Sequence, residues 1–250
     1  YPAHLAVHNL LIIASFFLLP RSVVLQPLPE QLRNLDRPQH PFLVPLTRRP
    51  EVTALWAALG NALLVAWWAG SVRDWVREGK LGLGMNERVR DQSKSAVRTA
   101  FTFYAALAYS IVIVLFGAPL STHLLHTLLL GFNLAILTTL VPSYAIGVPT
   151  LPLGLPFILK TQRARGSDSA LALNDTWIRL FAEQRPQNPS ERAMLYPAVG
   201  SLLGAWAGVI PIGLDWDRPW QAYPLTPLFG ATVGYVLGSF SGLAISIVYF

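Results

Sequence analysis

Long apolar stretches alternate with short polar segments along the chain. Asp, Glu, Lys and Arg are absent from five runs, at residues 1–20, 52–72, 99–159, 193–214 and 219–250. Runs of about 20 apolar residues match the thickness of a bilayer's hydrocarbon core. These runs are continuously apolar and lack the alternation of a membrane β-strand. The pattern therefore predicts an all-α, polytopic membrane protein.

The run at residues 99–159 is long enough for more than one helix, and Gly117 and Pro119 interrupt it. Pro removes a backbone donor and clashes inside a helix. We therefore expect a tight helical hairpin there, whose second helix ends near Pro142. The proline-rich stretch 148–159 is too short to span and is expected at the interface or against neighbouring helices. One membrane domain over residues 1–250 then has six spans, at approximately 3–19, 52–72, 96–116, 120–141, 193–212 and 225–249.

Composition supports this class and excludes others. Charged residues make up 13% of the chain, about half the roughly 25% of soluble domains. The chain has no Cys, which excludes disulfides, zinc–thiolate sites and a thiol nucleophile. The net charge of +6 is divided among the loops, so loop bias explains it better than nucleic-acid binding does. The chain begins at Tyr1, and we expect further residues to precede it.

The basic residues also predict which way the spans run. The segments 73–98 and 142–192 carry 13 Lys or Arg, and the segments on the opposite side carry six. The positive-inside rule places the richer side, and with it both termini, in the cytoplasm. The segments 26–51, 117–119 and 213–224 then face the lumen or outside. The sequon at Asn174 would lie on the cytoplasmic side and stay unglycosylated.

One loop is expected to carry a short surface helix at residues 175–184, which Asn174 or Asp175 could cap. Its apolar residues, Trp177, Leu180 and Phe181, would share one face. The prediction is a helix lying in the membrane interface. A plain loop helix is the alternative.

Glycine recurs at every fourth position in the last two spans. Residues four apart lie on one helix face, and glycine lets two membrane helices approach closely. We expect these two helices to pack tightly, most simply on each other, while a lipid-tail groove along the stripe is the alternative. The glycines are Gly200, Gly204 and Gly208 in the fifth span and Gly230, Gly234, Gly238 and Gly242 in the sixth.

The densest polar cluster lies between those two spans. In an extended stretch Asp215 and Asp217 project to the same side, and such a pair could hold a divalent metal or an ammonium head group. The carboxylates could equally pair with Arg218, cap the next helix or dock a partner. We favour a luminal latch that contacts a partner or a lipid head group, with no catalytic or metal role. Its residues are Asp215, Trp216, Asp217, Arg218, Trp220 and Gln221.

The remaining polar residues in the spans give weak signals. The histidine pairs His4/His8 and His123/His126 have spacings that share a helix face, but no metal-site motif accompanies them. The lone amides Asn61 and Asn133 are expected to hydrogen-bond neighbouring helices. The chain contains no P-loop, nucleophile elbow or dinucleotide fingerprint.

The run GAWAGVIPIGLDWDRPWQAYP at residues 204–224 closely resembles the PIG-F family of glycosylphosphatidylinositol (GPI) anchor synthesis, as does FGATVGY at 229–235. The run VLFGAPL at 114–120 is similar to the junction between that family's third and fourth spans. Gly213 and Tyr223 depart from the family pattern, which has Pro and Trp there, but the core DWDRPW is intact. The long, charged loops resemble those of fungal members.

The resemblance implies an accessory subunit of the endoplasmic reticulum membrane. Such a subunit stabilises a large catalytic GPI ethanolamine-phosphate transferase, PIG-O or PIG-G in the human naming. That partner moves ethanolamine phosphate from phosphatidylethanolamine to a GPI mannose and is expected to carry the metal, while this chain needs no cofactor. Two alternatives remain: a lipid-handling protein that presents or scrambles GPI or phosphatidylethanolamine, and a phosphoryl-transfer enzyme that uses Asp215 and Asp217.

Overall fold

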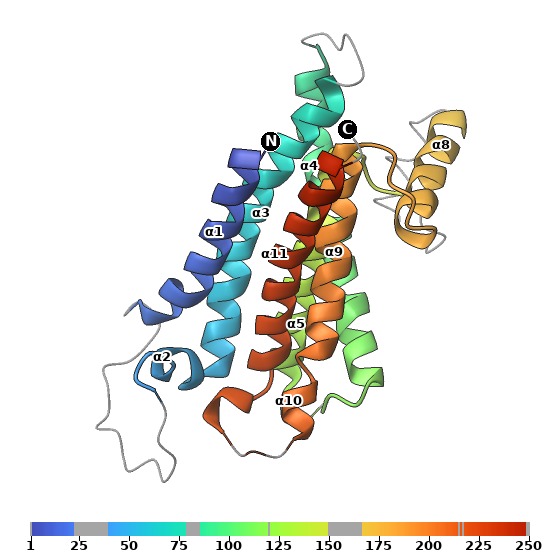
Figure 1. The fold of residues 1–250 in the computed structure, drawn as a ribbon. Coiled ribbons are helices and arrows are strands. Elements are labelled where there is room, and N and C mark those ends of the chain that lie inside the picture. The colour runs from blue at the N-terminus through green and yellow to red at the C-terminus, as the bar shows by residue number, and fades with distance from the viewer. Residues whose placement is uncertain are drawn as a thin grey trace.

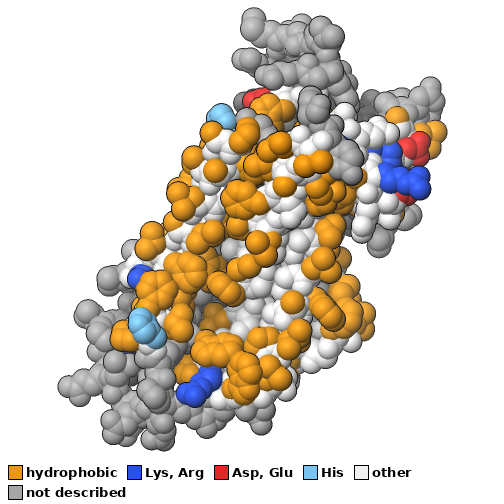
Figure 2. Space-filling model, viewed as in Figure 1, with side chains coloured by type: hydrophobic (Ala, Val, Ile, Leu, Met, Phe, Trp, Pro, Cys, Tyr) orange, Lys and Arg blue, Asp and Glu red, His pale blue; other side chains and the backbone are white. Residues whose placement is uncertain are grey.

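The computed structural model describes residues 2–22, 40–78, 86–119, 121–149, 167–214, 216 and 218–248. These residues form helices and connecting turns, with no strand among them. Six of the described helices are long and apolar enough to cross a membrane, which confirms the all-α prediction. Figure 1 shows them as an elongated bundle, and Figure 2 shows hydrophobic side chains along its length.

The membrane-crossing helices follow one another along the chain and are joined by short helical segments. The chain's first helix begins, and its last helix ends, at the end of the bundle where α8 lies (Figure 1). The opposite end holds α2 and α10 (Figure 1). Five spans each contain one long helix: α1 (Pro2–Leu18), α3 (Pro50–Glu78), α4 (Asn86–Leu115), α9 (Pro189–Ala207) and α11 (Leu225–Val248). The fourth span is made of three consecutive helical segments, α5 (Leu124–Ala135), η3 (Ile136–Leu140) and α6 (Val141–Ala145). The other described segments are η1 (Leu19–Arg21), α2 (Val44–Thr47), α8 (Ser167–Trp177), η4 (Ile178–Ala182), α10 (Ile210–Gly213) and η5 (Pro219–Gln221).

Helices α4 and α5 form a hairpin at the predicted break. Gly117 has a φ of 103°, a conformation that side chains disfavour. Its N–H bonds the carbonyl of Val114, and the N–H of Ala118 bonds that of Ile113. This pair of bonds is the glycine-terminated Schellman arrangement, which satisfies the last carbonyls of a helix. Gly117 therefore ends α4, and Pro119 follows where the helix could not continue.

The fourth span does not end near Pro142, as the sequence suggested, but continues to Ala145. The turn that precedes Pro142 is the π-helix η3. In a regular α-helix the proline ring would clash with the carbonyl four residues earlier, and a wider π turn relieves such a clash. The helix therefore passes through the proline instead of stopping at it.

The two glycine stripes face each other across an antiparallel pair, α9 and α11. A Cβ atom added to Gly200 would overlap the carbonyl oxygen of Gly234, and one added to Gly204 would overlap that of Gly230. Gly208 meets the backbone of Thr226 in the same way. Gly238 and Gly242 continue the contact against the first turns of α9. The backbones touch, so no lipid tail lies along the stripe.

Hydrogen bonds between buried side chains connect the other helices. Asn61 of α3 donates from Nδ2 to Oδ1 of Asn133 on α5, at 3.0 Å. Asn133 in turn donates to the carbonyls of Ala54 and Leu129. On α1, Nε2 of His8 lies 3.0 Å from the hydroxyl of Tyr235 on α11. Such bonds replace those that water would provide outside the membrane.

The short helix expected at residues 175–184 begins earlier than predicted. Helix α8 starts at Ser167 and runs into η4, so Asn174 and Asp175 lie inside it and do not cap it. Its predicted apolar face packs on protein: Leu180 is fully buried, and Nε1 of Trp177 donates to the carbonyl of Gly147 at 3.0 Å. The sequence could not show that the rest of the bundle would cover this face. Most of the stretch 148–159 lies outside the described residues.

Replacing Gly234 with Ala should destabilise the protein, because the added Cβ would overlap the carbonyl of Gly200. Overpacking typically costs about 1–3 kcal/mol. Gly70→Ala on α3 is the matched control, because a Cβ there meets no atom within 4 Å and Ala is favoured over Gly in helices by up to about 1 kcal/mol. The measurement is the thermal unfolding midpoint of each variant in detergent. Equal midpoints for the two variants would show that the α9–α11 contact does not limit stability.

Candidate functional site

The predicted latch lies where the chain passes from α10 to α11, at the α2 end of the bundle. Trp216 and Arg218 are exposed there, and the short helix η5 follows. The rings of Trp216 and Trp220 meet edge to face, with 5.9 Å between centroids. Indoles favour the boundary between membrane and water. The turn thus presents an aromatic pair beside an arginine at one end of the bundle.

Gln221 holds this turn together. Its Oε1 accepts a hydrogen bond from the backbone N–H of Arg218 at 2.7 Å. Its Nε2 donates to the carbonyl of Pro211 on α10 at 2.5 Å. The backbone N–H of Gln221 also bonds the carbonyl of Arg218. One side chain therefore connects both sides of the turn.

Tyr223 joins the end of the turn to α5. Its hydroxyl lies 3.0 Å from Oγ1 of Thr127, and burial raises the pKa of the phenol, so it stays protonated and able to bond. The rings of His123 and His126 both lie beside the ring of Tyr223. The centroids of the two histidine rings are 5.0 Å apart. Nε2 of His126 lies 3.8 Å from Oε2 of Glu51 on α3. At this end of the bundle a polar layer is therefore formed by Glu51, His123, His126, Thr127 and Tyr223.

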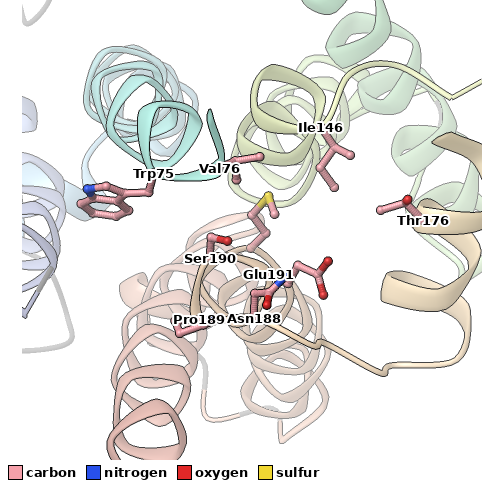
Figure 3. A pocket seen from close by; sticks show the side chains of 9 residues that line it. Trp75, Val76, Ile146, Thr176, Asn188, Pro189, Ser190 and Glu191 are labelled. Carbon is pink, nitrogen blue, oxygen red and sulfur yellow. The ribbon is translucent and has the colours of Figure 1, made fainter. Parts of the chain in front are cut away.

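A pocket of about 420 Å³ lies at the opposite end of the bundle, between α3, α6, α8 and α9 (Figure 3). Its carboxylate, Glu191, makes a bidentate pair with Arg179 at 2.6 and 2.9 Å. Glu191 also accepts a hydrogen bond from the backbone N–H of Gln187. The carboxylate of Glu191 is bonded by these donors and anchors η4 to α9. The pocket thus lies where the surface helix α8 and η4 dock against the bundle.

The structure describes four of the six predicted latch residues. Trp216, Arg218, Trp220 and Gln221 belong to the turn described above, whereas Asp215 and Asp217 lie outside the described residues. Among the residues that the structure describes, no group of three or more acidic or histidine side chains could hold a metal ion. The described part of the turn offers donors, an arginine and indoles, which suit docking or head-group contact.

Two features of this layer were missed by sequence reasoning. The contact between His126 and Glu51 joins residues far apart in the chain, so spacing within one helix could not reveal it. The hydrogen bond from Gln221 to Pro211 was also missed, because it depends on α10 returning toward η5. The pattern Arg-Pro-x-Gln did carry a weak signal, since a side chain three residues on can reach back to a backbone N–H.

A family model described as the GPI biosynthesis protein family Pig-F matches residues 46–243. The match includes both glycine stripes and the turn between them. No solved structure matches the chain.

Curated relatives carry names from the same process. "Glycosylphosphatidylinositol anchor biosynthesis protein 11" of Aspergillus fumigatus is 38% identical over 130 residues, which are 52% of this chain and 34% of that protein. "GPI ethanolamine phosphate transferase, stabilizing subunit" of Homo sapiens is 31% identical over 134 residues, 54% of this chain and 50% of that protein. The chain thus matches a third to a half of the length of these two relatives.

Gln221→Ala should loosen the turn, because both side-chain hydrogen bonds are lost. A hydrogen bond typically contributes about 1 kcal/mol, so we expect the backbone N–H of Arg218 to exchange with solvent roughly fivefold to thirtyfold faster. Gln187→Ala is the matched control, because Gln187 uses its backbone N–H and not its side chain to reach Glu191. Hydrogen exchange monitored by mass spectrometry measures the exchange rate at Arg218 in both variants. Unchanged exchange at Arg218 in Gln221→Ala would mean that the side chain does not hold the turn.

Proposed function

The chain belongs to the GPI biosynthesis protein family Pig-F, and we propose that it is the non-catalytic, stabilising subunit of a GPI ethanolamine-phosphate transferase in the endoplasmic reticulum membrane. The observation that carries this proposal is the match over residues 46–243, together with relatives named as stabilising subunits. The partner would be a large catalytic subunit similar to PIG-O or PIG-G. The metal and the transfer chemistry would belong to that partner.

The site geometry supports a docking role. The side chain of Gln221 and the hydroxyl of Tyr223 bond within the protein, which stiffens the turn. Trp216 remains 54% exposed on this rigid base. Aromatic and arginine side chains on a preformed surface are typical anchors of protein interfaces. The described turn therefore resembles a contact surface for a partner more than a reaction centre.

The positive-inside rule supports the orientation proposed for the bundle. The segments 73–98 and 142–192 carry 13 of the basic residues, and α3 ends and α9 begins at the end of the bundle where α1 begins (Figure 1). We propose that this end is cytoplasmic and that the latch turn is luminal. The latch would then lie on the side where the partner acts.

Trp216→Ala should lower recovery of the catalytic subunit in mild detergent. Loss of an aromatic interface anchor costs about 2 kcal/mol or more, which corresponds to roughly 30-fold in Kd. Trp206→Ala is the matched control, because Trp206 is also exposed, at 68%, but lies within the apolar span of α9 and not in the latch turn. The measurement is the molar ratio of partner to this chain after purification. Equal recovery with both variants would exclude Trp216 as an anchor.

The accessory role itself is tested by activity per assembled complex. Asp215→Asn and Asp217→Asn should leave ethanolamine-phosphate transfer near normal once the rate is divided by the amount of intact complex. A thousandfold fall with assembly intact would show that these carboxylates take part in chemistry. Lipid transport by the purified chain alone would favour the lipid-handling alternative.

Glycosylation reports the orientation. A sequon introduced near Arg33 should be modified, because the 26–51 segment is proposed to be luminal. The natural sequon at Asn174 should remain unmodified. Asn174 lies inside α8, so a second sequon introduced within residues 79–85 serves as the control for the same end. Modification at 79–85 but not near Arg33 would reverse the topology.

A further inference from the structure

An apolar groove runs between α1 and α11 on the face shown in Figures 1 and 2. Phe16 and Thr232 are buried at its floor, while Ile13, Phe229 and Leu237 stand partly exposed around it. The hydroxyl of Thr232 donates to the carbonyl of Leu228 within α11. The groove therefore offers an entirely apolar lining to the hydrocarbon core.

The size of the groove limits what can fill it. Its volume is about 250 Å³, and its wall on α11 extends from Phe229 to Leu237, about 12 Å at 1.5 Å per residue. A helix is about 10 Å in diameter, so a partner's helix could cover this groove from outside but could not enter it. The groove matches a single extended chain within one leaflet, which is about 15 Å thick, half of the hydrocarbon core.

A fixed cation lies beyond the end of the groove at the α2 end of the bundle. The groove residue Phe17 packs against Phe42, with 5.7 Å between ring centroids. The guanidinium of Arg21 lies over the other ring of this pair, 3.8 Å from the centroid of Phe42, and Nη2 donates to the backbone carbonyl of Phe42 at 3.0 Å. A guanidinium has five N–H donors and this bond uses one. Within the described part of the chain, the exposed Arg21 makes no other hydrogen bond, so its remaining donors are available to a phosphate.

We propose that this groove binds one acyl chain of a membrane phospholipid, whose phosphate is held by Arg21. The arrangement places a positive charge one aromatic ring beyond an apolar channel, which is the order of charge and hydrocarbon in a phospholipid. Arginine suits phosphate better than lysine does, because its planar fork can donate two parallel hydrogen bonds. This proposal goes beyond the accessory role and does not depend on it.

The test uses the full chain in phosphatidylcholine nanodiscs that contain a phosphatidylcholine probe with a photoreactive group on one acyl chain. We expect the probe to label peptides that line the groove, and Val233→Trp to lower this labelling at least fivefold by filling the space. Leu203→Trp is the matched control, because Leu203 is 61% exposed on α9 and does not line the groove. Native mass spectrometry should show one phospholipid retained by the unmodified chain.

The role of Arg21 is tested separately. Arg21→Gln should lower labelling by the phosphatidylcholine probe about threefold to tenfold and leave labelling by a matching diacylglycerol probe unchanged. Arg48→Gln, an exposed arginine at the same end, should change neither. Equal effects of Arg21→Gln on the two probes would overturn the phosphate contact.

Two results would overturn the groove assignment. Unchanged labelling in Val233→Trp would mean that the probe samples the general lipid surface. Lower recovery of a co-purifying protein in Val233→Trp, with lipid labelling unchanged, would show that the groove seats a partner's side chain.

Discussion

Direct backbone contact between α9 and α11 is the constraint on which the functional end of the protein depends. Gly200 and Gly204 meet Gly234 and Gly230 with no room for a Cβ. In a bilayer, lipid tails are as apolar as leucine, so helices gain stability from close packing rather than from hydrophobic burial. The contact fixes the register of the two helices. It thereby fixes where α10, η5 and the turn between them lie.

Buried hydrogen bonds complement this packing elsewhere. Asn61 and Asn133 join α3 to α5, and His8 joins α1 to α11 through Tyr235. A polar group in hydrocarbon must find a partner inside the protein. These bonds therefore specify which helices are neighbours, whereas the apolar side chains around them would tolerate several arrangements.

The two ends of the bundle are built differently. At the α2 end, side chains of the latch turn are fixed by Gln221 and Tyr223, while Trp216 stays exposed. At the other end, Arg179 and Glu191 dock the surface helix. A rigid turn with exposed aromatic groups suits an accessory subunit, because binding then orders few side chains and costs little entropy.

The sequence by itself determined the all-α class, the six apolar helices, the hairpin at Gly117 and the glycine positions, because each follows from local composition and spacing. It misplaced the end of the fourth span and the start of α8, where a π turn passes Pro142 and the surface helix extends back to Ser167. Only the tertiary structure decided that Asn61 meets Asn133, that Glu51 meets His126, and that α1 and α11 enclose a groove. Such contacts join distant parts of the chain, and they exist only once the helices have packed against one another.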